Sequence, residues 1–338
     1  MTAIHLNHIC KVFGADSAVA LHLLQQGVGK EEIRRRTGAI LALRDVSITV
    51  GRGEILAVVG LSGSGKSTLL RVINRLIEPT DGNVNVYGED ILGFSSAALQ
   101  AFRRQTVSMV FQGFGLLPHR TVTENVGYGM VAQRRPRHEW EEISRRWIRR
   151  VGLSGYETAY PFQLSGGMRQ RVGLARALAT QAPVLLMDEP FSALDPIIRH
   201  DMQDLLLSLQ AELKKTIVVI THDLNEAVRL GDRVAVLNDG SIVQTGQPAE
   251  IILRPTNDYV SRFAVDVNRL RALKACDIML PSHDGQAIDL TVAEDASIEE
   301  VLSHQMLGEE PIKVINSTGS VTGIIECKTV RALLRRGA

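Results

Sequence analysis

The sequence has no long hydrophobic run. Its longest apolar stretches, such as Ile55 to Val59 and Ile217 to Ile220, are far shorter than the roughly 20 residues that a membrane-spanning helix requires. Residues 1–13 also lack a basic region followed by an apolar core and a small-residue cleavage site, so we expect no secretory signal. A role in a membrane process would therefore require another subunit to supply the membrane part.

Cysteine is scarce, and neither sign of charge predominates. Cys10, Cys276 and Cys327 are far apart and form no C-x-x-C pair, which favours a reducing compartment. The 38 basic and 37 acidic side chains nearly cancel, so no overall field would draw nucleic acid or anionic lipid to the protein. Partners must be recognised locally.

Up to about residue 250, short β-rich runs alternate with helical stretches, which is typical of an α/β domain with a mainly parallel sheet. The strands expected at its buried centre are Ile55–Val59, Val107–Phe111, Val184–Met187 and Thr216–Ile220. A second, antiparallel group is expected from Ile48–Val50, Asn83–Val86 and Arg233–Asn238.

Two segments stand outside this alternation. Residues 15–40 look helical and are expected to form a surface insertion. From residue 266 the pattern changes to the alternating run Ile288 to Val292, a helix over Ser297 to Leu302, and strands at Ile312–Ile315 and Val321–Ile325. With 338 residues in all, the chain is long enough for one large domain and this smaller appended one.

The segment Gly60 to Ser67 matches the pattern G-x-x-x-x-G-K-S between a predicted strand and a predicted helix. We interpret it as a P-loop for ATP, whose glycines let backbone N–H groups surround the phosphates. Lys66 would reach the terminal phosphates and Ser67 would face Mg²⁺. A chance glycine-rich turn is a weak alternative. The nucleotide-binding residues predicted here are Gly60, Ser62, Gly63, Ser64, Gly65, Lys66, Ser67 and Thr68.

Two carboxylates, Asp188 and Glu189, follow the apolar run Val184 to Met187. They could merely cap the next turn. Beside a P-loop, the better interpretation is that Asp188 holds Mg²⁺ and Glu189 polarises the attacking water. About 20 residues earlier, Ser165, Gly166 and Gly167 open a predicted helix, a sequence that by itself is an ordinary helix cap.

The order P-loop, Leu-Ser-Gly-Gly, Asp-Glu resembles that of ABC ATPases over roughly residues 4 to 250. The resemblance implies that Gln112 binds Mg²⁺, positions water and couples to a membrane subunit, and that His222 contacts the γ-phosphate. Asp195 would lie in the loop through which two ATPase copies sense each other. Phe13 would stack on adenine, although the insertion after it makes its spacing unusual and a buried Phe is the default interpretation.

The implied fold is an α/β P-loop NTPase: an ABC ATPase domain over residues 1–265 with a mixed sheet and a helical subdomain near 113–180. The implied assembly is a head-to-tail homodimer in which each P-loop faces Ser165 to Gly167 of the other copy. The expected partners are integral membrane permease subunits and a periplasmic or lipid-anchored solute-binding protein. The chain would be peripheral, on the cytoplasmic face of the inner membrane.

Within this family, the chain resembles ATPases of glycine betaine, proline betaine and choline importers. The likeness is carried by the segments Leu61–Leu70, Asn74–Thr80, Leu117–Val122 and Ser165–Arg176, and by the insertion after Phe13. Residues 266–338 resemble a single CBS motif. Such motifs normally work in pairs, so this one could pair with its copy in the dimer or be only a stabilising cap.

Other functions remain as alternatives. The arginine-rich stretches at 134–137 and 145–150 could bind nucleic acid, lipid or the membrane subunit, but a solvated helix face is the simpler interpretation, and we expect no nucleic-acid partner. The chain has neither the long coiled coil of repair ATPases nor the two nucleotide sites of translation-associated ones. An importer of another amino-acid-like solute, such as histidine, remains open because the solute would never touch this chain.

Overall fold

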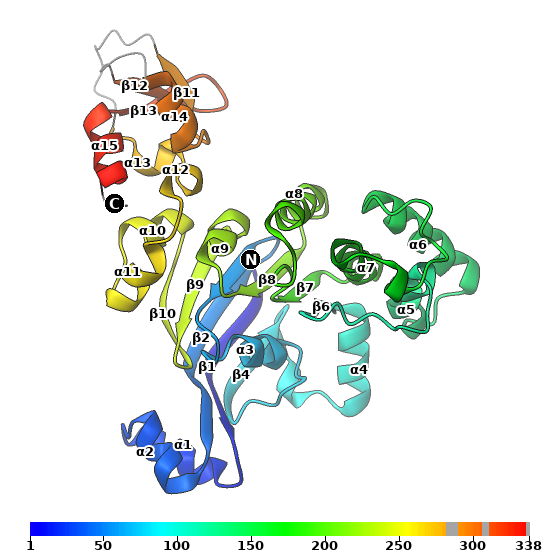
Figure 1. Cartoon of the computed structure of the whole chain (residues 1–338). Coiled ribbons are helices and arrows are strands. Elements are labelled where there is room, and N and C mark those ends of the chain that lie inside the picture. Colours follow the sequence, from blue (N-terminus) through cyan, green and yellow to red (C-terminus); the bar gives the residue numbers. More distant parts are fainter. Residues whose placement is uncertain (282–289, 306–310, 336–338) are drawn as a thin grey trace. The chain divides into compact units, whose positions relative to one another are not determined.

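The structure is a computed structural model that describes residues 1–281, 290–305 and 311–335. Internal contacts group it into two units (Figure 1): Met1–Asp223 with Leu230–Val243, and Leu224–Arg229 with Gln244–Ala338. Among the described helices, none is both long enough and apolar enough to span a membrane. The predicted domain boundary at residue 265 stays a prediction.

The first unit is built around a six-stranded sheet in the order β10-β9-β3-β8-β7-β6. Strands β3, β7 and β8 are buried at every residue, as expected for parallel strands covered on both faces. All four strands predicted for the buried centre are present, but β6 forms the edge of this sheet and ends at Val110, one residue before the predicted Phe111. Their bounds are β3 Ile55–Val59, β6 Val107–Val110, β7 Val184–Asp188, β8 Thr216–Thr221, β9 Arg233–Asn238 and β10 Ser241–Gly246.

An antiparallel sheet has the order β2-β1-β4-β5. It contains β1 Thr2–Phe13, β2 Ile40–Gly51, β4 Asp81–Val86 and β5 Glu89–Asp90. Two of the three segments predicted for such a group are therefore confirmed. Assigning Arg233–Asn238 to it was wrong, because β9 pairs in parallel with β3. Its four consecutive buried residues, Val234 to Leu237, suit a strand covered on both faces.

Helices α1 (Ser17–Gln25) and α2 (Lys30–Thr37) lie within the predicted insertion. They have a small core of their own, in which Ala20 and Ile33 pack with Val12, Ala39 and Leu41 from the adjoining strands. The insertion is thus held to the end of the β1–β2 ribbon by apolar contacts.

The other helices of the first unit follow the strands. Helix α3 comes directly after the P-loop, and α5, α6 and α7 lie between β6 and β7 along the chain (Figure 1). The bounds are α3 Lys66–Ile73, η1 Ile91–Gly93, α4 Ser96–Gln105, α5 Val122–Ala132, α6 Arg137–Arg150, η2 Pro161–Gln163, α7 Gly166–Ala179 and α8 Pro196–Leu213.

The second unit contains a three-stranded sheet in which β11 pairs in parallel with β12, and β12 pairs antiparallel with β13. This agrees with the strand and helix order predicted for the tail, although Ile288 and Asp289 lie outside the described residues. The bounds are α9 Leu224–Leu230, α10 Pro248–Leu253, α11 Asp258–Ala264, α12 Arg269–Ala272, α13 Ala275–Ile278, β11 Thr291–Ala293, α14 Ile298–Gln305, β12 Ile312–Ile315, β13 Val321–Ile325 and α15 Cys327–Arg335.

Candidate functional site

The predicted P-loop joins β3 to α3 and can be formed only with glycine at two of its positions. A Cβ at Gly60 would overlap the carbonyl oxygen of Leu237, and one at Gly65 would overlap that of Ala42. Gly65 also has a φ of 105°, a backbone conformation that residues with a side chain rarely adopt. The glycines therefore let the loop pass close to two carbonyl groups on its way to the N-terminus of α3, a position that can bind phosphate.

Lys66 is only 5% exposed. Its Nζ donates to the carbonyl oxygens of Gly60 at 2.7 Å and Leu61 at 3.1 Å, and lies 3.9 Å from Oε1 of Glu189. Burial lowers the pKa of Lys66, and the negative charges of Glu189 and Asp188 partly offset this effect. An ammonium so enclosed is suited to an anion arriving at the loop.

Asp188, at the end of β7, is 3% exposed. Its Oδ1 accepts a hydrogen bond of 2.9 Å from the Ser67 hydroxyl. Carboxylate and hydroxyl oxygens are the ligands that Mg²⁺ prefers, so this pair fits the predicted metal site. The sequence analysis missed Arg71, whose Nη2 lies 3.5 Å from Oδ2 of Asp188 one helical turn after Ser67. No local pattern marked this contact, because Asp188 lies 117 residues away in the sequence.

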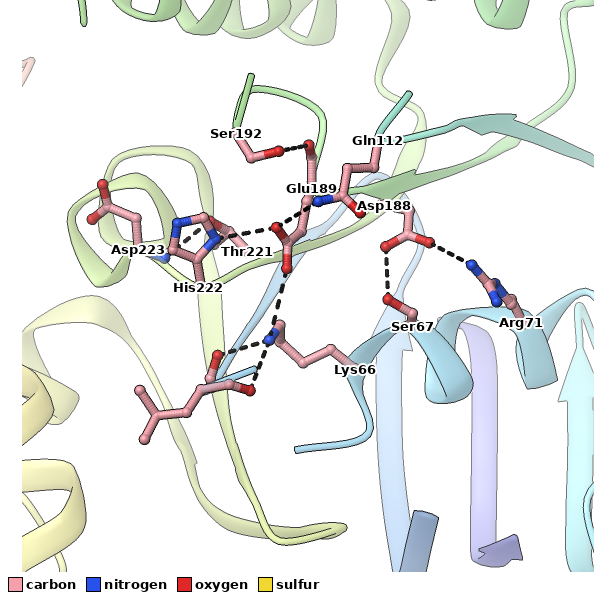
Figure 2. Close-up of polar contacts among 12 residues, drawn as sticks. Lys66, Ser67, Arg71, Gln112, Asp188, Glu189, Ser192, Thr221, His222 and Asp223 are labelled. Carbon is pink, nitrogen blue, oxygen red and sulfur yellow. Dashed lines mark hydrogen bonds and ion pairs between the residues drawn. The ribbon is translucent and has the colours of Figure 1, made fainter. Parts of the chain in front are cut away.

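Glu189 is the point where the predicted catalytic side chains meet (Figure 2). Its Oε2 accepts from Nε2 of Gln112 at 3.3 Å and lies 3.1 Å from Nδ1 of His222. Gln112 was also predicted as a metal ligand, and this role stays a prediction, because the contact of its side chain is with Glu189. Glu189 has a φ of 43°, an unusual backbone conformation for a non-glycine residue and one found often at functional sites.

The loop after Glu189 leads to the predicted dimer contact. The Ser192 hydroxyl donates to the carbonyl oxygen of Glu189 at 3.0 Å. Asp195 caps α8, because its Oδ1 accepts from the N–H of Ile198 at 3.0 Å. This cap fixes the start of α8 and leaves the sensing role of Asp195 a prediction.

Ser165 caps α7 by accepting from the N–H of Met168 at 3.3 Å. Gly166 and Gly167 form the first turn, where N–H groups have no partner within the helix. A Cβ at Gly167 would lie 2.6 Å from Cγ2 of Ile198, so the turn packs closely on α8. Such a helix start can bind an anion.

Phe13, predicted to stack on adenine, ends β1 and is 39% exposed. Directly across the strands lies Ile40, which is 51% exposed and which the sequence analysis missed. Two residues further along β2 is Ala42, whose carbonyl oxygen packs against Gly65 of the P-loop. Phe13 and Ile40 are thus exposed apolar neighbours at the end of the β1–β2 pair. The Lys11 ammonium lies 4.9 Å from the centre of the Phe13 ring, and adenine stacking on this ring stays a prediction.

Comparison with known proteins places this geometry in a family. The model for the family described as ABC transporter matches residues 43–192. The glycine betaine/carnitine transport ATP-binding protein GbuA of Listeria monocytogenes is 43% identical over 99% of this chain and 83% of its own length. The glycine betaine transport ATP-binding protein OpuAA of Bacillus subtilis is 46% identical over 88% and 72%.

Among solved structures, the dimeric post-hydrolysis ATP-binding cassette MJ0796 bound to ADP and Pi is similar, with a TM-score of 0.61 and 32% identity. The match covers 72% of this chain and 98% of that one. The predicted fold of an ABC ATPase is therefore confirmed.

Proposed function

The chain belongs to the ATP-binding subunits of ABC transporters, and we propose that it hydrolyses ATP to energise the uptake of a betaine-type solute with a quaternary ammonium group. The observation that carries the solute class is the extent of the match to GbuA, which includes 99% of the chain. It therefore spans the insertion and the tail as well as the nucleotide site.

We propose that this site binds Mg-ATP. The P-loop N–H groups and Lys66 would hold the β- and γ-phosphates, while Ser67, Asp188 and the Oε1 of Gln112 would hold Mg²⁺. Bound Mg²⁺ would supply charge neutralisation on the phosphate oxygens. The enclosed ammonium of Lys66 supports this assignment, because an anion compensates a buried cation.

Hydrolysis requires a water aligned with the terminal phosphate. Glu189 would orient this water and take its proton, while Gln112 and His222 hold the carboxylate from two sides. His222 would also donate to the γ-phosphate, as the family resemblance implies. This division of roles makes Glu189 necessary for hydrolysis and not for nucleotide affinity.

We also propose a head-to-tail homodimer. Ser165, Gly166 and Gly167 begin α7 with free N–H groups suited to a γ-phosphate, and the similar cassette MJ0796 is dimeric. Each site would then be completed by the α7 start of the second copy. Asp195, beside this start, would report on the partner's site.

A groove in the first unit is suited to a permease segment. It has a volume of about 370 Å³ and begins next to Gln112, with the exposed apolar side chains of Leu76, Phe111 and Tyr128 on its wall. An apolar helical segment of a membrane subunit would bury these side chains. The protein would thus lie at the inner face of the membrane, with a solute-binding protein outside.

The test is reconstitution in liposomes with the permease and solute-binding proteins proposed as its partners. We expect glycine betaine, proline betaine or choline to stimulate ATP hydrolysis, and Leu76→Glu to abolish stimulation while leaving the basal rate unchanged. Stimulation by histidine alone would replace the betaine assignment with that of another amino-acid-like solute. No response to any solute would refute the importer proposal, although basal hydrolysis would still support the ATPase.

A further inference from the structure

Helix α7 is bonded to the segment Gly113 to Gly115, here called the strap, which directly follows Gln112. Arg176 donates to the carbonyl oxygens of Gly115 at 2.5 Å and Phe114 at 3.2 Å. Seven residues earlier on the helix, the guanidinium of Arg169 lies 5.2 Å from the centre of the Phe114 ring. Two arginines two turns apart on α7 therefore hold the end of the strap: Arg176 binds its last two carbonyl groups, and Arg169 lies against the Phe114 ring.

Burying the charged guanidinium of Arg176 against the strap costs free energy. Arg176 is only 9% exposed, and burial lowers its pKa. Its hydrogen bonds go to neutral carbonyl groups, with no ion pair to a carboxylate among the described residues. Hydrogen bonds from an ionised donor are about twice as strong as neutral ones, so a buried guanidinium fixes the two carbonyl oxygens more firmly than a neutral donor could.

The strap is also shaped to receive these bonds. Phe114 and Gly115 both have positive φ angles, of 62° and 59°, which direct two successive carbonyl groups toward α7. A Cβ at Gly173 would lie 3.5 Å from the Phe114 carbonyl oxygen. The strap therefore approaches α7 closely at a residue without a side chain. A non-glycine residue in this conformation is strained, and such strain persists only where its surroundings hold it.

We propose that Arg169 and Arg176 are positioning residues that link the two ATP sites of the dimer. This inference rests on the proposed head-to-tail assembly. The start of α7 would bind the γ-phosphate held by the partner. The same rigid helix holds the strap, and the strap places Gln112 against Glu189 of its own site, 3.3 Å away. Occupation of one site thereby aligns the catalytic carboxylate of the other.

Arg176→Met is the test, with Arg171→Met as the matched control. Arg171 lies on the same helix and also donates to a carbonyl oxygen, that of Val151 at 2.8 Å, but does not contact the strap. Steady-state hydrolysis by the full chain is measured against Mg-ATP concentration, and dimer formation is measured by size exclusion with each change added to Glu189→Gln.

For Arg176→Met we expect kcat to fall by roughly 10- to 100-fold, the effect of a misplaced catalytic group. KM should change little and the Hill coefficient should fall toward 1. Arg176→Lys should restore part of kcat, since one charged donor returns. The Mg-ATP dimer should still form in the Glu189→Gln background, and Arg171→Met should behave as wild type. Arg169→Gln, which removes a half-buried contact, should lower kcat and the Hill coefficient less.

Wild-type kcat and cooperativity in both Arg176→Met and Arg169→Gln would overturn the inference. So would an equal loss in Arg171→Met, because the arginines would then only support the helix. If the unaltered chain did not hydrolyse ATP, or Glu189→Gln did not dimerise, the proposed function itself would fail, a result distinguishable from failure of the link alone.

Discussion

At the scale of single residues, the carboxylate of Glu189 is separated in role from the groups that hold nucleotide. Gln112 and His222 contact its Oε2. Lys66, whose Nζ lies 3.9 Å from Oε1 of Glu189, and Ser67 belong to the start of α3 after the P-loop. Glu189→Gln should therefore lower hydrolysis by about 10²- to 10⁴-fold, the usual contribution of a general base. It should also accumulate a closed dimer with Mg-ATP, detected by size exclusion.

Lys66→Ala gives the contrasting result, loss of nucleotide binding and of the dimer together. Glu142→Gln, at an exposed position on α6, serves as the control and should leave both properties unchanged. A Glu189→Gln protein that stays monomeric with Mg-ATP would count against the role of this carboxylate.

Gln170 on α7 is fully buried, and neither Nε2 nor Oε1 has a hydrogen-bond partner among the described residues. An unpaired buried polar group costs about 1 to 3 kcal/mol. Gln170→Met keeps the volume of the side chain and removes the polar atoms, so the free energy of unfolding should rise by about this amount. Urea denaturation measures the change. If Gln170→Met instead lowered the free energy of unfolding by about 1 to 3 kcal/mol, the Gln170 amide would have hydrogen-bond partners in solution.

At the scale of elements, α5 begins with a capping box. The Thr121 hydroxyl accepts from the N–H of Glu124, and the Glu124 carboxylate accepts from the N–H of Thr121 at 2.8 Å. These bonds lower the pKa of Glu124 below its ordinary 4.5. The carboxylate therefore stabilises the folded state above pH 4.5, and this contribution is lost as the pH falls through the lowered pKa.

Thr121→Ala should cost about 1 kcal/mol at neutral pH, the usual effect of losing an N-cap. The difference from wild type should shrink on acidification below pH 4.5, which denaturation at a series of pH values would show. Thr123→Ala is the control, because its hydroxyl bonds the carbonyl oxygen of Glu157 and not the cap. A difference that stayed constant with pH would show that the Thr121 hydroxyl does not stabilise the Glu124 carboxylate, because the N–H of residue 121 donates to that carboxylate in both proteins.

The same scale shows what the sequence could predict. Strands β3, β7 and β8 and the motifs at their ends were predicted because each is a local pattern with its own chemical reason. Strand β9 was misassigned because a short apolar run does not specify its neighbour. The contacts of Arg71, Arg169 and Arg176 were missed for a related reason. Each joins segments distant in the sequence. The residues around an arginine on a helix do not reveal whether its guanidinium faces solvent or binds a distant part of the chain.

At the scale of the whole molecule, every predicted nucleotide, metal and catalytic residue lies in the first unit, from Phe13 to His222. The tail after residue 265 belongs to the second unit and contributes none of them. A chain ending at Val265 should therefore keep its rate of ATP hydrolysis and, with Glu189→Gln, its Mg-ATP dimer. Both are measured as for the full chain.

In liposomes, the comparison of full and truncated chains at low and high salt then isolates the tail. If the predicted CBS-like unit pairs with its copy, that pairing adds to the free energy of dimer formation and gives the tail a means to alter it. We expect salt to change solute-stimulated hydrolysis in the full chain and not in the truncated one. Equal responses would make the tail a stabilising cap, in which case truncation should lower the unfolding temperature of the remaining chain, residues 1–265.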